Sequence, residues 1–307
     1  MTTTIETIGL TDTIQQAFEN HLAKMPANSV IREKRVMAME HFLRMGIPDK
    51  HHEEYKYSNP RTYLKDNLKM EAAGELNVPA KRFKKLLPLK NAHVIVMVNG
   101  IFSSELSQLI PTDSSLLISN LSSIYSSQRD VIETHYGLYA DVASDAFIAL
   151  NTALAKDGAY IRVAANTVVN EPVHIINLIS SSESFFANTR NLIIAEAGSK
   201  IDILETFVSM DSANNEKLFT NHVSEIVVQE NAQVSYCKIQ AEEGNTAQIN
   251  TCQVHQKKGS LFNNYTFSLS GEFVRNNLNI VLDDQNCEAH LFGLRLSRQV
   301  RPKHIER

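Results

Sequence analysis

Residues 190–240 read RNLIIAEAGSKIDILETFVSMDSANNEKLFTNHVSEIVVQENAQVSYCKIQ, and they decide the fold of this chain. The stretch consists of strand-length runs in which apolar and polar residues alternate. Turn sequences such as Ala197-Gly198-Ser199 and Glu230-Asn231-Ala232 separate the runs. The same texture extends over residues 160–294, where strand starts recur mostly every 11 to 15 residues. We therefore expect a mainly β region with no interposed helices.

This strand series cannot be a sheet of βαβ units, because a parallel crossover helix needs more residues between strands. It fits either an antiparallel sandwich or a solenoid whose coils stack on one another. The periodicity alone leaves these two alternatives open. In the solenoid, alternate residues point inward, so Ile201, Ile203, Val234 and Tyr236 would share the interior.

The first 90 residues have the spacing of helices. A first helix would start with Thr11 or Asp12 as its N-cap, and a second would run from about Ser29 to Met45. A short third helix could begin at Pro79.

The region that follows mixes helix and strand. His93–Val98 is a β-like run that ends at the turn Asn99-Gly100, and residues 141–156 have helical spacing and stop at Asp157-Gly158. The domain organisation expected from the sequence is a helical N-terminal domain at 1–90, a mixed lead-in at 91–158, a β core at 159–294 and an irregular basic tail at 295–307.

Composition excludes several classes of protein. The chain has 307 residues and a formal net charge of −4, which argues against nucleic acid as its main partner. Its N-terminus resembles neither a secretory signal nor a transit peptide, and its most apolar stretch, residues 93–102, is too short to span a bilayer. Three cysteines without a CxxC pair argue against a disulfide framework and against structural zinc. We expect a cytoplasmic protein with no membrane partner.

No common catalytic motif is present. The sequence lacks GxxxxGK[ST], a GxGxxG that follows a strand, GxSxG and HExxH. Nucleotide hydrolysis by this chain is therefore not expected.

Some residue groups invite a chemical interpretation, but a structural one is favoured for most. They are His51-His52 beside Glu53-Glu54, the strand histidines His222, His255 and His290, the thiols Cys237, Cys252 and Cys287, the pair Asp283-Asp284, and the basic segment Lys81–Lys90. Adjacent residues diverge on a helix or strand, so the first group is interpreted as solvated and the acid pair as a turn. The thiols are expected in the core and not in a sulfur relay. The basic segment fits a solvated helix face and an acidic partner equally well.

Several segments, taken in order, resemble the SufB/SufD core family. The segments are Glu54-Tyr55-Lys56-Tyr57 for E-x-W-K-Y, Asp145–Ala153 for D-x-F-x-x-L-N-x-A, Glu171–Ile176 for P-[IV]-H, then Arg190–Ile193, Asn221-His222, Glu230–Ala232 and Arg275–Leu278, and lastly Leu291–Leu294 for L-[YF]-G-L. Tyr55 stands where the family has Trp. The helical N-terminal region favours the SufD branch over the SufB branch.

The resemblance implies a right-handed parallel β-helix preceded by an α-helical N-terminal domain. It also implies a non-catalytic scaffold subunit for iron–sulfur cluster assembly that pairs with SufB and with the ATPase SufC. A cluster would be held only transiently and only in the full complex. The alternative is a β-helix enzyme acting on polysaccharide.

The sequence departs from the family pattern at RLSRQVRPKHIER, residues 295–307. This end suggests a truncated or out-of-frame product that lacks the family's SufC-binding and cluster-holding segment. SufC binding by this chain is accordingly doubtful, and self-association through the uncovered end is expected. No residue is assigned as catalytic, cofactor-binding or metal-binding.

Overall fold

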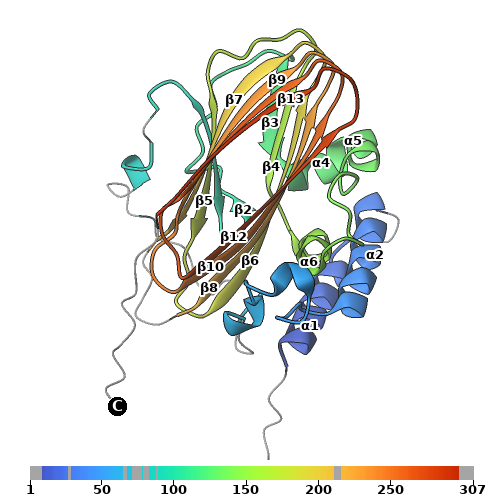
Figure 1. Cartoon of the computed structure of the whole chain (residues 1–307), viewed down its shortest axis with the longest axis vertical. Helices are drawn as coiled ribbons and strands as arrows, with labels where there is room; N and C mark the ends of the chain where they lie inside the picture. The colour runs from blue at the N-terminus through green and yellow to red at the C-terminus, as the bar shows by residue number, and fades with distance from the viewer. Residues whose placement is uncertain are drawn as a thin grey trace, which may run out of the picture.

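The computed structural model describes residues 9–26, 29–64, 68–70, 78, 83–87, 89–210 and 216–296. Strands account for 40% of the chain and helices for 22%, and the strands wind into a β-solenoid of about five turns that follows a helical region (Figure 1). The prediction of a mainly β solenoid after N-terminal helices is confirmed. Parallel pairing throughout the coils excludes the sandwich.

Each coil contributes one strand to each of two sheets. The six-stranded sheet contains, in spatial order, β12 (Phe273–Leu282), β10 (Thr246–Gln256), β8 (Leu218–Val228), β6 (Phe185–Ala195), β4 (Ala159–Val163) and β3 (Leu116–Asn120). The seven-stranded sheet contains β13 (Glu288–Arg295), β11 (Leu261–Ser268), β9 (Gln233–Ala241), β7 (Lys200–Ser209), β5 (Val173–Ile179), β1 (His93–Val98) and β2 (Ile101–Phe102).

The tight turns between the two sheets stack into a ladder of left-handed residues, which we call the turn ladder. Its members are Asn166, Gly198, Asn231, Gly259 and Asn286, with φ between +57° and +66°. Each of the first four donates its backbone N–H to a carbonyl of the next turn, as Gly198 does to Glu230 at 2.8 Å.

Asparagine and glycine alternate along the turn ladder for a steric reason. A Cβ on Gly198 would lie 2.5 Å from Oδ1 of Asn166, and one on Gly259 would lie 2.4 Å from Oδ1 of Asn231. The asparagine of one coil thus occupies the space that a side chain on the next coil would need, and only glycine fits both the space and the positive φ.

The interior of the solenoid is apolar near these turns. In-register pairing stacks Ile161, Ile193, Ile226, Val254 and Ile280 on successive strands. Ile201, Ile203, Val234 and Tyr236 belong to the same buried cluster, so their predicted interior position is confirmed.

The two ends of the solenoid differ. At the first end, β2 pairs antiparallel with β1, and β3 pairs antiparallel with β4. At the other end, β12 and β13 are the edge strands of their sheets.

The helices are α1 (Leu10–Ala23), α2 (Val30–Met45), α4 (Leu121–Ser127), α5 (Arg129–Thr134) and α6 (Ala146–Leu154), with 3₁₀ turns at Glu53–Tyr55 and Pro60–Thr62. Residues of α1, α2 and α6 share one hydrophobic cluster with Phe186, Phe219 and Ile249 of the six-stranded sheet. The second helix is confirmed, including its flanks at Ser29 and Gly46.

Two predicted helix boundaries were wrong. The first helix begins at Leu10 with Gly9 as its N-cap, and not after Thr11 or Asp12, because Leu10 is drawn into the core. The helix expected over 141–156 begins only at Ala146, because Asp145 caps it by accepting the N–H of Phe147 at 2.7 Å.

The end of this last helix was also predicted too late. It ends at Leu154, three residues before the expected stop at Asp157-Gly158. Asp157 instead accepts the backbone N–H of Ser122 at 2.9 Å. Gly158 is needed for close approach, since a Cβ there would lie 1.3 Å from the carbonyl oxygen of Arg190. The helix expected to start at Pro79 falls largely outside the described residues.

A buried ion pair attaches the segment between α5 and α6 to the solenoid. Nη2 of Arg190 lies 2.7 Å from Oε2 of Glu225, and both side chains are fully buried. Glu225 also accepts the backbone N–H groups of Gly137, Tyr139 and Ala140 at 2.9–3.0 Å.

Gly198→Ala should destabilise the fold through the turn ladder. A left-handed alanine costs about 1–2 kcal/mol, and the contact with Asn166 adds to this. We expect urea denaturation to show a loss of about 2 kcal/mol or more in the free energy of unfolding. Gly293→Ala is the control, because nothing lies within 4 Å of a Cβ there. Equal effects of the two substitutions would contradict the role of the turn ladder.

Glu225→Gln should leave Arg190 as a buried charge without its carboxylate. Breaking a buried pair in this way costs about 3–5 kcal/mol, measurable by the same denaturation experiment. Glu133→Gln removes the exposed pair of Glu133 with Arg129 and should leave the free energy of unfolding unchanged within error. A Glu225→Gln protein as stable as the parent chain would show that the pair does not hold the segment.

Candidate functional site

The half of the solenoid interior that lies away from the turn ladder is polar. Pairing stacks Thr189, His222, Asn250 and Asn276 on one sheet, and Ile175, Glu205, Lys238 and Thr266 on the other. Glu205, His222 and Lys238 are each no more than 3% exposed. We call this region the polar interior.

Glu205 accepts the most hydrogen bonds in the polar interior. Its Oε1 accepts the side-chain amides of Asn177 at 2.8 Å and Asn191 at 2.7 Å. Its Oε2 accepts the hydroxyl of Tyr236, whose pKa burial raises well above its ordinary value. These three donors satisfy both oxygens of the buried carboxylate.

His222 lies beside this carboxylate, with Nε2 3.4 Å from Oε1 of Glu205. Its Nδ1 lies 2.5 Å from Oγ1 of Thr189, and its Nε2 lies 2.8 Å from Oγ of Ser224. Burial lowers the pKa of His222 to about 4, so the ring is neutral at physiological pH. Each of these contacts of His222 has a structural role.

Lys238 and Cys252 also lie buried in this region and carry atoms that could act as nucleophiles. Nζ of Lys238 donates to Oδ1 of Asn250 at 2.9 Å and of Asn276 at 2.7 Å, and burial lowers its pKa to about 8. Burial raises the pKa of Cys252 to about 12, which keeps the thiol protonated and unreactive.

The three thiols do not face one another. Cys252 faces the interior, whereas Cys237 is half-buried on the outer side of β9, and Cys287 lies in the turn before β13. Burial also raises the pKa of Cys237. Of the three thiols, Cys252 alone occupies the core position that was predicted for all of them.

The other residues singled out in the sequence lie apart. His51 and His52 are exposed, and His52 contacts Asp49 at 3.2 Å. His255 contacts Asp283 at 3.1 Å on the outer surface, and His290 lies beside Glu288 at 3.7 Å. Asp283 and Asp284 form part of the predicted turn. Lys81 and Arg82 fall outside the described residues. Among those described, no group of three His, Cys, Asp or Glu side chains could hold a metal ion.

The motif residues of the N-terminal half hold the helices against the solenoid. The hydroxyl of Tyr55 donates to Asp145 at 2.6 Å, and the guanidinium of Arg275 lies 4.2 Å from the centre of the Tyr55 ring. Asn151 donates to the carbonyls of Thr189 and Asn221 at 2.8 and 2.9 Å. The segments whose sequence resembles the family therefore contact one another where the helices pack on the solenoid.

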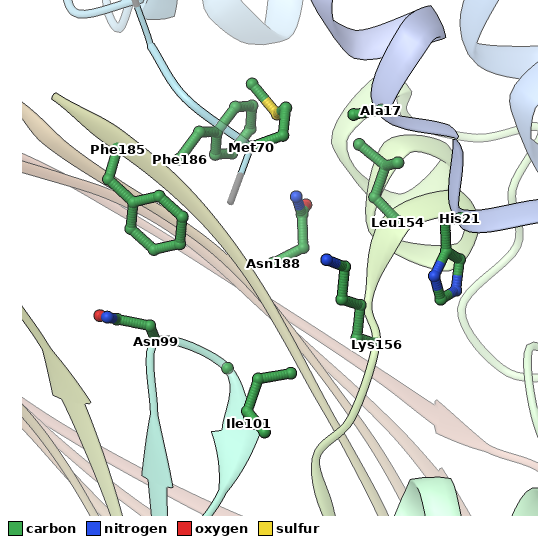
Figure 2. A pocket seen from close by; sticks show the side chains of 11 residues that line it. Ala17, His21, Met70, Asn99, Ile101, Leu154, Lys156, Phe185, Phe186 and Asn188 are labelled. Atoms are coloured by element: carbon green, nitrogen blue, oxygen red, sulfur yellow. The ribbon is translucent and has the colours of Figure 1, made fainter. Parts of the chain in front are cut away.

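Several cavities and grooves lie among the described residues. One cavity of about 30 Å³ lies between α1, α6, the β1–β2 turn and β6, where Figure 2 shows His21, Lys156 and Asn188 around it. It has room for about one water molecule. An open groove of about 600 Å³ runs beside β10 and β12 and is lined by polar side chains including Asp141, Gln253 and Asn279.

Large apolar side chains are exposed together on the last described coil, β12 and β13, which we call the open end. Six large apolar side chains there are 44–59% exposed: Val281, Leu282, Leu291, Phe292, Leu294 and Leu296. The positions paired with Leu291 and Leu282 one coil earlier are Asn264 and Gln256, which are 5% and 0% exposed. Edge strands with apolar side chains recruit further strands.

The described helices include none that is long and apolar enough to cross a membrane.

The histidines of the solenoid predict a pH dependence of stability. The folded-state pKa of His222 and of His174 is about 4, below the ordinary value of 6.5. Their contribution is therefore fully present above pH 6.5 and is lost as the pH falls, by about 1.4 kcal/mol per pH unit for each. His222→Gln should lower this slope by up to about 1.4 kcal/mol per pH unit between pH 6.5 and 5 in urea denaturation, whereas substitution of the exposed His52 by Gln should not change it. An unchanged slope in His222→Gln would contradict a neutral buried ring.

Two family models together match nearly the whole described chain. The SufBD protein N-terminal region matches residues 10–175, and the SUF system FeS cluster assembly SufBD core domain matches residues 177–303.

Curated relatives are similar at low identity. An iron–sulfur cluster assembly SufBD family protein of Synechocystis is 25% identical over 95% of this chain and 66% of its own length. The iron–sulfur cluster assembly protein SufD of Escherichia coli is 23% identical over 83% of this chain and 57% of its own length. The SufBD family protein ABCI9 of Arabidopsis thaliana is 23% identical over 73% and 47%. The chain thus spans 47–66% of the length of these three relatives.

The ordered motifs, the solenoid and the family matches agree, and the chain belongs to the SufBD family of SUF-system iron–sulfur cluster assembly proteins.

Proposed function

We propose that this chain is a non-catalytic scaffold subunit of an iron–sulfur cluster assembly complex, in which it pairs with SufB and works with the ATPase SufC. The observation that carries the proposal is the family match over the solenoid, since the SufBD core-domain model covers residues 177–303. Among the described residues, β12 and β13 are the edge strands of their sheets and expose apolar side chains, so they are the candidate contact. A second solenoid of the same family presents strands of the same spacing, so it can continue both sheets at once.

A scaffold role agrees with where the ionisable groups lie. Glu205, His222 and Lys238 are enclosed within the solenoid and engaged with their neighbours. The groove beside β12 is lined by side chains such as Arg275, which already donates to the carbonyl of Glu54 at 2.6 Å. These arrangements favour a structural platform over an enzyme acting on polysaccharide.

The cluster is cargo in this proposal and not a resident cofactor. It would be held transiently at the contact with the partner chain, in the assembled complex. The three described cysteines are free thiols, which suits the reducing cytosol proposed as the location.

Leu291→Glu should weaken the contact with SufB. A charge on the open end would have to be buried between the two solenoids, which opposes binding. In a pull-down or by calorimetry with a purified SufB homologue, we expect at least about a tenfold loss of affinity, equal to about 1.4 kcal/mol. Leu138→Glu is the control, because Leu138 is 61% exposed but lies in the segment before α6.

Three outcomes are informative. If the parent chain and Leu291→Glu bind SufB equally well, the open end is not the contact. Light scattering of the chain alone tests self-association through the same edges, which Leu291→Glu should also reduce. Addition of SufC to the chain, with and without SufB, tests the ATPase contact, and failure to join a complex even with SufB present would contradict that part of the proposal.

A further inference from the structure

A carboxyl group is buried where β9 ends. Glu242 is 1% exposed, and its carboxylate accepts the Thr220 hydroxyl at 3.1 Å. It also accepts the side-chain amides of Gln248 at 3.1 Å and Gln240 at 3.4 Å. All three donors are neutral.

Each of these two amides also holds a buried oxygen with no hydrogen-bond partner among the described residues. The atoms are Oε1 of Gln240 and Oε1 of Gln248, on side chains that are 0% exposed. A buried acceptor without a partner is unfavourable and indicates a missing ligand or water. Rotation of an amide by half a turn exchanges its nitrogen and oxygen with little change of shape. The amides can therefore present either donors or acceptors to the carboxylate.

The carboxylate has no cation in contact among the described residues. Lys238, on the same face of β9, directs its Nζ to Asn250 and Asn276 instead. Burial consequently raises the pKa of Glu242 to about 7. Near neutral pH the site holds either a proton or a negative charge that needs a counter-ion.

We propose that Glu242, Thr220, Gln240 and Gln248 form a binding site for a hard monovalent cation, Na⁺ or K⁺. When both amides turn their oxygens inward, the ion meets carboxylate, hydroxyl and amide oxygens only, which are the ligands such cations prefer. One carboxylate balances one positive charge, whereas a divalent ion would leave a net buried charge.

The loops around the site would enclose the ion. The hydroxyls of Ser270 and Thr246 donate to the backbone carbonyl of Glu242 at 2.8 and 3.2 Å. Gly271 lies against the Gln240 amide, since a Cβ there would be 3.2 Å from Nε2. Ion binding would therefore fasten the β9–β10 and β11–β12 loops together, one coil below the open end.

Thermal unfolding at pH 8 tests the site. The ionic strength is held constant while NaCl or KCl replaces choline chloride, whose cation is too large for the site. We expect the midpoint of the parent chain to rise by about 2 °C or more at saturating Na⁺ or K⁺. Glu242→Gln should lose this response, because it carries no charge. Glu243→Gln removes the exposed neighbouring carboxylate and should keep it.

Further outcomes decide against the site. Equal responses of the parent chain and Glu242→Gln would overturn the proposal. A midpoint that changes with pH around 7 but not with Na⁺ or K⁺ would show that a proton alone occupies the site, and would also overturn it. If Glu242→Gln does not fold, Thr220→Val removes one ligand with little change of volume. It should weaken the apparent ion affinity at least about threefold, and an unchanged affinity would contradict the assignment.

Discussion

The in-register stacking of the turn ladder is the constraint on which the rest of the structure depends. A strand that slipped by one residue would exchange its inward and outward side chains. The alternation of Asn166, Gly198, Asn231 and Gly259 opposes such a slip, because each asparagine fits only against the glycine of the next coil. Register is thus fixed at one margin of each coil, and the interior ladders follow from it.

A fixed register makes the polar interior possible. Glu205 and Lys238 pair in register on adjacent strands, and each is satisfied mainly by neutral amides from other strands. The ion pair of Arg190 and Glu225 performs the same task outside the sheet, where it attaches the segment before α6. Satisfied buried polar groups favour a single arrangement of coils, since any other leaves charges unpaired.

Much of the fold could be predicted from local chemistry. Turn residues such as Asn231 and Gly259 and the alternation around Ile201 predicted strands and their inward faces, whereas sandwich and solenoid were distinguished only by family resemblance. The polar interior could not be predicted from the alternation of residues, because polar residues normally mark the solvent-facing side of a strand. Every residue of β8 is buried, including its polar ones. Glu225 on β8 was missed for this reason, and Glu205 on β7 and Glu242 after β9 were missed as well. Asp145 was recognised as part of a motif but not as the cap that shortens α6.

We propose that the solenoid pairs with SufB through β12 and β13, the edge strands of its two sheets among the described residues. Hydrogen–deuterium exchange, with and without a SufB homologue, tests this directly. Exchange should be slow in β6 to β9 in both states, and fast exchange at the outer edges of β12 and β13 should become slow in the complex. Protection that appears only on the helices or on β2 and β3, with β12 and β13 unchanged, would contradict it.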